Sequence, residues 1–92
     1  MTTYLVTYDL TAPGRNYDDL YEAIKSYGTW AHVVESVWEI CSDTTTAAHV
    51  RDHLGQFLDG NDKIFVTVVG RESAWRGLRE SLTAWLKKNH GE

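Results

Sequence analysis

Asp9 is the residue whose type and position point most directly to chemistry. It lies near the end of a run of β-branched and aromatic residues at positions 4–10, shortly before the pair Pro13-Gly14. Aspartate is disfavoured in strands, so a carboxylate there is expected to be buried at a cost, paired, or used in function. The alternative is structural, because Asp9 could instead cap the following loop through an Asx turn.

One carboxylate by itself is a poor divalent-metal site, because Mg²⁺ prefers several oxygen ligands. In a two-fold dimer, however, two copies of Asp9 could face each other, and their repulsion would favour a shared proton or a shared divalent cation. A cation held there could polarise a phosphate and activate water. This reasoning makes Asp9 a candidate ligand for Mg²⁺ or Mn²⁺.

Other reactive side chains form no recognised motif. His49 and His53 are four residues apart and could share a Zn²⁺, but no third ligand is evident, and we interpret them as an exposed helix face. His32 could act as an acid or base, although a packing role is the simpler interpretation. The single cysteine, Cys41, is predicted to be a small core residue, and it implies no disulfide. Neither a phosphate-binding glycine loop nor a GxSxG serine turn is present.

Composition limits the possible classes of function. The 92 residues predict one domain spanning 1–92, and the net charge of −4 argues against a general nucleic-acid coat. Basic residues concentrate in residues 71–92, where they could contact phosphate or form a solvated helix face. No signal peptide or spanning apolar segment is evident, so we expect a cytoplasmic protein with no membrane partner.

The elements that must position these residues follow from the hydrophobic periodicity. A strand is predicted at 4–10, and a helix capped by Asn16 is predicted from Tyr17 to a stop at Gly28. The later elements are a hairpin of strands Ala31–Glu35 and Val37–Ser42 that bends near Ser36, a helix that follows possible caps at 43–46, a turn at 59–62, a strand at Ile64–Val69, and a C-terminal helix at about 73–90. The strand at 64–69 is almost wholly apolar, which predicts a central position or cover on both faces.

This order predicts an α+β fold: a ferredoxin-like β-α-β-β-α-β antiparallel sheet with an added C-terminal helix. The first and third strands should lie in the middle, and the first two helices should share one face. The other face is left open unless the last helix or a second subunit covers it, and an open apolar face predicts a homodimer.

Three stretches resemble one known family. They are Val6-Thr7-Tyr8-Asp9-Leu10 at the end of the first strand, Tyr27-Gly28-Thr29 after the first helix, and Glu35-Ser36-Val37-Trp38-Glu39, which is similar to the family's Q-x-S-V-F-E stretch. Over residues 3–69 the chain resembles the small ferredoxin-like subunit of the CRISPR adaptation complex and its stand-alone relatives.

The resemblance implies a homodimer whose interface lies near the end of the first strand. It also implies that Asp9 matches the family's divalent-metal aspartate, with Ser36 and Trp38 beside it. Some members cleave RNA or DNA with a metal, whereas others only bridge DNA. The chain departs from the pattern in having only Arg15 after the first strand and a helix at the C-terminus, where many relatives add a strand.

Two functions therefore remain open. The first is a Mg²⁺- or Mn²⁺-dependent endonuclease acting on RNA or DNA as a homodimer, with Asp9 and Ser36 as catalytic residues and Arg15 and Trp38 as nucleic-acid contacts. The second is a non-catalytic dimeric interaction module that binds nucleic acid or a protein, with a role in toxin–antitoxin biology or phage defence. The position of Asp9 favours the first function, and the low basic content favours the second.

Overall fold

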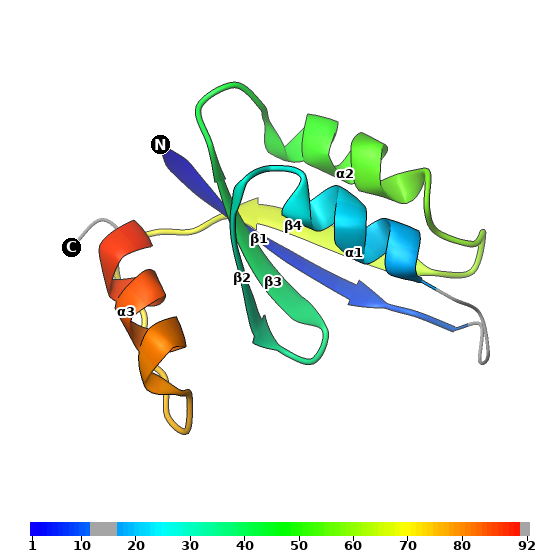
Figure 1. Ribbon diagram of the computed structural model, residues 1–92. Coiled ribbons are helices and arrows are strands. Elements are labelled where there is room, and N and C mark those ends of the chain that lie inside the picture. The colour runs from blue at the N-terminus through cyan, green and yellow to red at the C-terminus, as the bar shows by residue number, and fades with distance from the viewer. Residues whose placement is uncertain (12–16, 91–92) are drawn as a thin grey trace.

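A four-stranded antiparallel sheet forms the centre of the protein in a computed structural model, which describes residues 1–11 and 17–90 (Figure 1). The elements are β1 (Thr2–Asp9), α1 (Asp18–Lys25), β2 (Thr29–Val34), β3 (Val37–Ser42), α2 (Ala47–Gly55), β4 (Lys63–Val68) and α3 (Glu80–Asn89). The strand order is β2-β3-β1-β4, and each neighbouring pair is antiparallel. The predicted ferredoxin-like α+β fold, with β1 and β3 in the middle, is confirmed.

The main core lies between the sheet and the helices α1 and α2. Successive side chains of a strand point to opposite faces, and in β1 Tyr4, Val6 and Tyr8 are buried on the helix side. Val6 lies opposite Trp38 of β3 and Val66 of β4, so the same face is apolar across three strands. The buried residues of this core are Tyr4, Val6, Tyr8, Tyr17, Leu20, Ala23, Ile24, Trp38, Ile40, Val50 and Leu54.

Local signals explain where the two core helices begin and end. Asp18 and Asp19 occupy the first turn of α1, where negative charge is favourable, and Gly28 beyond its end has a φ of 90°. The predicted cap, Asn16, lies outside the described residues. In α2 the hydroxyl of Thr46 accepts a hydrogen bond from the backbone N–H of His49 at 3.2 Å, as expected for a threonine N-cap.

The hairpin and the fourth strand differ from the predictions in part. The turn falls at residues 35–36, near the predicted bend at Ser36, but β2 runs from Thr29 to Val34 rather than from 31 to 35. The prediction that the fourth strand is central or doubly covered was wrong. β4 pairs with β1 alone and lies at an edge, where Phe65 is 62% exposed. Its apolar run arises because alternate residues face α2 while the others face outward.

The third helix begins later than predicted. Gly77 has a φ of 82°, a left-handed conformation that ends helical geometry, so α3 starts at Glu80 and not near residue 73. Trp75 and Leu78 nevertheless pack with the helix, against a small second core of Ala31, Leu82 and Leu86. Ala31 lies opposite Glu39, on the sheet face that α1 and α2 leave open, so α3 covers the β2 side of that face.

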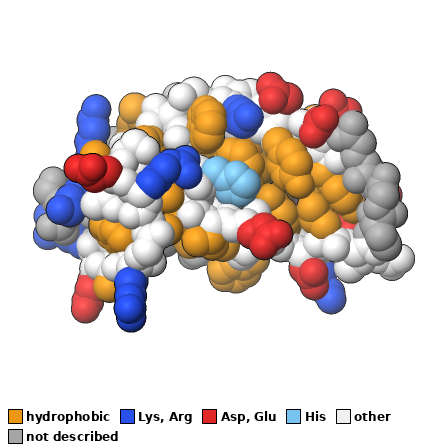
Figure 2. All heavy atoms as spheres, turned by 60° about the horizontal axis from the view of Figure 1, so that its bottom comes forward, with side chains coloured by type: hydrophobic (Ala, Val, Ile, Leu, Met, Phe, Trp, Pro, Cys, Tyr) orange, Lys and Arg blue, Asp and Glu red, His pale blue; other side chains and the backbone are white. Residues whose placement is uncertain are grey.

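Several large hydrophobic side chains stay exposed. They are Met1, Trp30, Val34, Phe65 and Val68. Figure 2 shows hydrophobic side chains interspersed with acidic and basic ones over one side of the molecule. None of the helices in the described ranges is long and apolar enough to cross a membrane.

Candidate functional site at the end of β1

Asp9 is the last residue of β1, and its side chain is exposed. The alternation of β1 directs it to the sheet face opposite α1 and α2, because Tyr8 before it points into the core. It lies opposite Lys63 of β4 in the strand register. A shallow hollow of about 200 Å³ runs between the two strands here and includes Phe65 in its lining. The carboxylate is therefore accessible at the end of a central strand.

A carboxylate other than that of Asp9 binds the backbone just after β1. Asp62 accepts hydrogen bonds from the backbone N–H of Thr11 at 2.8 Å, from the Tyr17 hydroxyl at 2.9 Å and from the backbone N–H of Asp59 at 2.8 Å. Within residues 1–11 and 17–90, no hydrogen bond or ion pair involves the Asp9 carboxylate. The Thr11 amide, which an Asx turn at Asp9 would use, is already engaged by Asp62.

Ser36 is held at the same end of the sheet. The backbone N–H of Tyr8 donates to the carbonyl of Ser36 at 3.3 Å, which extends the β1–β3 pairing one step beyond Thr7 and Val37. Ser36 therefore lies beside the residue that precedes Asp9, and it is exposed in the hairpin turn. Ser36 and Asp9, which are 27 positions apart in the chain, therefore lie at the same end of the sheet, with Ser36 across from Tyr8 rather than from Asp9.

Trp38 does not fit the role expected of it. Its side chain is 3% exposed, its indole N–H donates to the Tyr8 hydroxyl at 2.9 Å, and the His32 ring stacks on it at 3.9 Å. Burial of this kind argues against base stacking by Trp38, whose predicted contact with nucleic acid stays a prediction. Burial also raises the pKa of the Tyr8 hydroxyl, partly offset by the hydrogen bond from Trp38. The second predicted contact, Arg15, lies outside the described residues.

Comparison with known proteins identifies the family. Residues 1–77 match the family model described as CRISPR associated protein Cas2. The chain belongs to the Cas2 family. The matched residues include all four strands, both core helices and the Asp9 end of the sheet, whereas α3 lies beyond them. No solved structure was found that matches the chain.

Membership of the Cas2 family gives the chain a CRISPR-associated, nuclease-like character, and this directs attention to Asp9 rather than to the histidines. His53 Nδ1 forms a hydrogen bond with the Tyr27 hydroxyl at 2.9 Å, and its ring packs against Phe57. His32 Nε2 lies 3.0 Å from the carbonyl oxygen of Glu35. No group of three or more His, Cys, Asp or Glu residues within the described ranges could hold a metal.

A divalent cation at Asp9 would consequently depend on more than one chain. Each chain of this Cas2 family member offers one accessible carboxylate at the end of β1, and a second copy would offer another. Mg²⁺ is commonly bound by one or two carboxylates together with water and substrate phosphates, so this donor set fits such an ion. The roles that sequence reasoning gave to Asp9 and Ser36 stay predictions, and it missed Asp62, although it did predict the turn in which Asp62 lies.

Proposed function

We propose that this Cas2 family member is a metal-dependent endonuclease that cleaves RNA or DNA as a homodimer. The observation that carries the proposal is the exposed Asp9 carboxylate, which has no partner in the described part of the chain, lies opposite Lys63, and follows Tyr8, the backbone partner of Ser36. Asp9 would hold Mg²⁺ or Mn²⁺. When bound, that cation would polarise the scissile phosphate and activate a water molecule.

The residues around Asp9 suit a phosphodiester. The Ser36 hydroxyl is exposed and could donate a hydrogen bond to a phosphate oxygen, and the Lys63 ammonium could neutralise an adjacent phosphate. These groups bind and orient the backbone without reading its bases. The Asp9 carboxylate itself carries the metal, so the other two groups serve to position the substrate.

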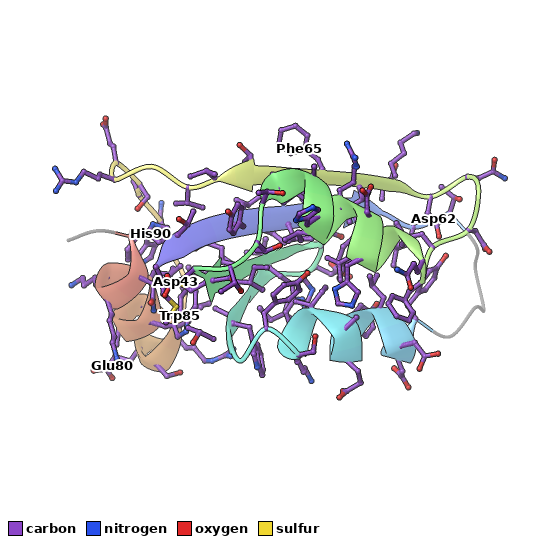
Figure 3. The ribbon with its side chains drawn as sticks, turned by 90° about the horizontal axis from the view of Figure 1, so that it is seen from above. Asp43, Asp62, Phe65, Glu80, Trp85 and His90 are labelled. Atoms are coloured by element: carbon purple, nitrogen blue, oxygen red, sulfur yellow. The ribbon has the colours of Figure 1, made fainter. Side chains whose placement is uncertain are left out.

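The homodimer is supported by the sheet face that α3 leaves uncovered. Phe65 lies opposite Thr7, and Thr7 lies opposite Val37, which makes a row across β4, β1 and β3 next to Asp9. Phe65, which is labelled on β4 in Figure 3, lies at the edge of this row. Its side chain is 62% exposed. A second copy packed on this face about a two-fold axis would bury the row and bring two Asp9 carboxylates together.

Cleavage of labelled single-stranded RNA and duplex DNA tests the proposal. The purified protein is incubated with Mg²⁺, with Mn²⁺ or with a chelator, beside the variant Asp9→Asn and the matched control Asp52→Asn, which alters an exposed carboxylate on α2. We expect chelator-sensitive cleavage that falls by roughly 100-fold or more in Asp9→Asn, the scale for losing one group that stabilises transition-state charge. Cleavage that persists in Asp9→Asn would refute the role of Asp9.

A second function, a non-catalytic dimeric module that binds nucleic acid or protein, is favoured by the charge distribution. Within residues 1–70 only four basic side chains accompany ten acidic ones, which weakens any electrostatic attraction to a phosphate backbone. A dimer in sedimentation experiments that cleaves neither substrate would support this function over the nuclease.

A further inference from the structure

Three side chains from separate parts of the chain form a hydrogen-bonded line beneath α3. The Ser73 hydroxyl lies 2.9 Å from His90 Nδ1, and His90 Nε2 lies 2.5 Å from a carboxylate oxygen of Glu39. Glu39 comes from the middle of β3, Ser73 from the segment after β4, and His90 from the end of α3. The proposed nuclease site uses none of them.

One assignment of the protons, an ionised Glu39 with a neutral His90, gives the hydrogen bonds the direction that a nucleophilic serine needs. An ionised carboxylate can only accept, so Nε2 of a neutral His90 carries the proton and donates it to Glu39. Nδ1 is then left with a lone pair, and it accepts from the Ser73 hydroxyl. A serine that donates to a histidine whose far nitrogen is held by a carboxylate is the arrangement of a nucleophile, a general base and an orienting acid.

The orienting acid and the base are buried, whereas the serine is exposed, as a serine nucleophile that must reach its substrate requires. Glu39 is 4% exposed and His90 is 6% exposed, whereas Ser73 is exposed. Burying a charged group without function is usually costly, and an apolar pair of similar volume often stabilises a fold as well or better. The ring of Trp75 packs edge-on against the His90 ring at 6.3 Å and limits its rotation. The base is therefore fixed while the nucleophile faces solvent.

Ser73 and His90 line a hollow of about 350 Å³. That volume lies near the lower end of the range for small-molecule sites, roughly 300 to 1,000 Å³. The charged side chains that line the hollow are Arg71, Lys87 and Glu72, so basic groups outnumber acidic ones, and the Trp75 indole adds an apolar surface. A ligand that carries a negative charge next to an apolar group would match this lining.

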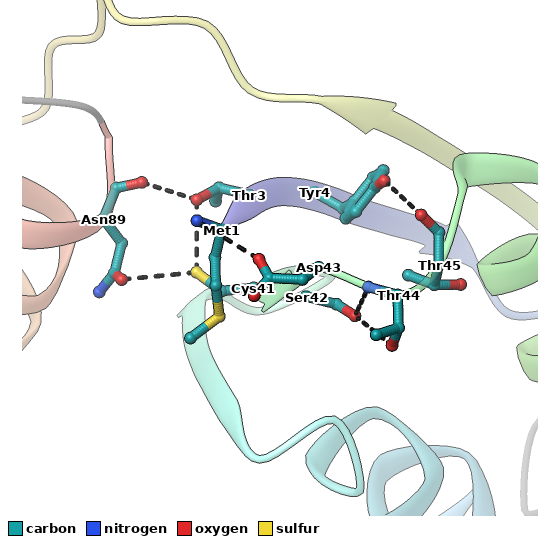
Figure 4. Close-up of polar contacts among 9 residues, drawn as sticks. All are labelled: Met1, Thr3, Tyr4, Cys41, Ser42, Asp43, Thr44, Thr45 and Asn89. Carbon is teal, nitrogen blue, oxygen red and sulfur yellow. Dashed lines mark hydrogen bonds and ion pairs between the residues drawn. The ribbon is translucent and has the colours of Figure 1, made fainter.

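The line is held in place by the attachment of α3 to the sheet. The Thr3 hydroxyl donates to the backbone carbonyl of Asn89 at 2.6 Å, and the Cys41 thiol lies 3.5 Å from the Asn89 side-chain oxygen (Figure 4). These contacts lie at the start of β1, six residues from Asp9, which corresponds to about 20 Å along a strand. Figure 3 likewise shows His90 and Asp62 at opposite ends of the molecule, so the two sites can be tested separately.

From this geometry we infer that Ser73, His90 and Glu39 form a second active site, which hydrolyses small anionic carboxylic esters. The Ser73 oxygen attacks the ester carbonyl carbon as its proton passes to His90 Nδ1. The bond to the alcohol then breaks, and the alcohol leaves with that proton. Water attacks the acyl group and gives a proton to Nδ1, and Ser73 regains a proton as the carboxylic acid departs. Glu39 keeps the ring oriented and is a positioning residue.

Labelling with diisopropyl fluorophosphate tests this inference on the full chain. In this reaction the Ser73 oxygen bonds to phosphorus, fluoride leaves, and the proton passes to His90. We expect one adduct per chain, located on Ser73 by peptide mass spectrometry, absent in Ser73→Ala and retained in Ser81→Ala, which removes an exposed serine on α3. An unlabelled Ser73, or equal labelling of Ser73 and Ser81, would overturn the inference. Either result can be read from the wild-type protein without any variant.

Two further measurements distinguish a catalytic role of these three residues from a role only in holding α3 on the sheet. Glu39→Gln keeps a hydrogen-bond acceptor for His90, so circular dichroism should be unchanged while the labelling rate falls by about tenfold or more. Mono-4-nitrophenyl succinate should be hydrolysed faster than 4-nitrophenyl acetate, and Arg71→Ala should remove that preference. An unchanged labelling rate in Glu39→Gln would mean that the three residues serve only to hold α3. Asp9→Asn leaves the Ser73 site unchanged. The labelling of Ser73 and the cleavage of nucleic acid therefore test the esterase inference and the proposed nuclease independently.

Discussion

The two faces of the sheet are held by different kinds of interaction. On the α1–α2 face, large apolar side chains such as Leu20, Ile24 and Ile40 are fully buried together. On the α3 face, the small apolar cluster around Leu86 is accompanied by buried polar groups, including the Glu39–His90 pair. Apolar burial is non-directional and sets overall stability, whereas hydrogen bonds are directional and set position. The first face therefore depends mainly on apolar burial, whereas on the second face directional hydrogen bonds also fix the positions of the side chains.

The largest expected difference between the faces comes from a matched pair of truncations. Leu20 and Leu86 are both almost completely buried, one on each face. Leu20→Ala should lower the free energy of unfolding by about 4 kcal/mol and Leu86→Ala by about 2 kcal/mol, within the usual range for such changes, because the smaller cluster can relax around the cavity. Urea unfolding followed by far-UV circular dichroism measures both. Equal losses would mean that the two faces contribute alike.

A smaller effect is expected where the main core contains a polar contact. Tyr8→Phe removes the acceptor of the Trp38 indole N–H and leaves that donor buried and unpaired, which should cost about 1–3 kcal/mol. Tyr4→Phe is the control, because the Tyr4 hydroxyl donates to a part-buried loop carbonyl, that of Thr45, which water can reach. A loss in Tyr8→Phe no greater than that in Tyr4→Phe would contradict the assigned hydrogen bond.

The smallest expected effect is a pH dependence of folding stability that arises from Glu39 on the α3 face. Burial raises the pKa of Glu39, and the interaction with His90 only partly offsets this. A carboxyl with a raised pKa in the folded state stabilises the fold below its unfolded pKa, and that contribution is lost as pH rises through the folded value. Glu39→Gln lacks this loss, so its stability relative to wild type should increase as pH rises above 4.5, the ordinary pKa of a glutamate.

Thermal unfolding of Glu39→Gln and wild type at a series of pH values measures this trend. The control Asp52→Asn changes an exposed carboxylate and should keep a constant difference from wild type across the same range. A difference for Glu39→Gln that stayed flat or decreased with rising pH would show that Glu39 is not desolvated in the folded protein.

The sequence allowed the α1–α2 face to be predicted because its signals are local. Alternation in β1 and helical spacing in α1 are visible within a few residues, and Thr46 marks the start of α2 by its type. The position of β4 in the sheet was harder to predict, because an apolar run does not reveal whether one face or both faces of a strand are covered. The edge position also depends on which strand β4 pairs with. The start of α3 was set by the positive φ of Gly77, which composition alone does not reveal.

The candidate sites also differ in whether they depend on local sequence signals or on contacts between distant residues. Asp9 could be singled out as a candidate because an aspartate at the end of an apolar strand is unusual by itself. Asp62 could not be linked to the loop after β1, because 51 positions separate it from Thr11, its hydrogen-bond donor. Ser73, Glu39 and His90 are likewise distant in sequence, and no short motif connects them. Only the docking of α3 on the sheet brings these three side chains together.

Binding of Mn²⁺ tests the central claim about Asp9 most directly. Titration followed by electron paramagnetic resonance counts bound cations without relying on cleavage, and Asp9→Asn and Asp52→Asn are measured in parallel. We predict one Mn²⁺ for every two chains in the wild type and in Asp52→Asn, with that binding lost in Asp9→Asn. Wild-type binding that persists in Asp9→Asn would contradict the account, because the cation would then be held elsewhere.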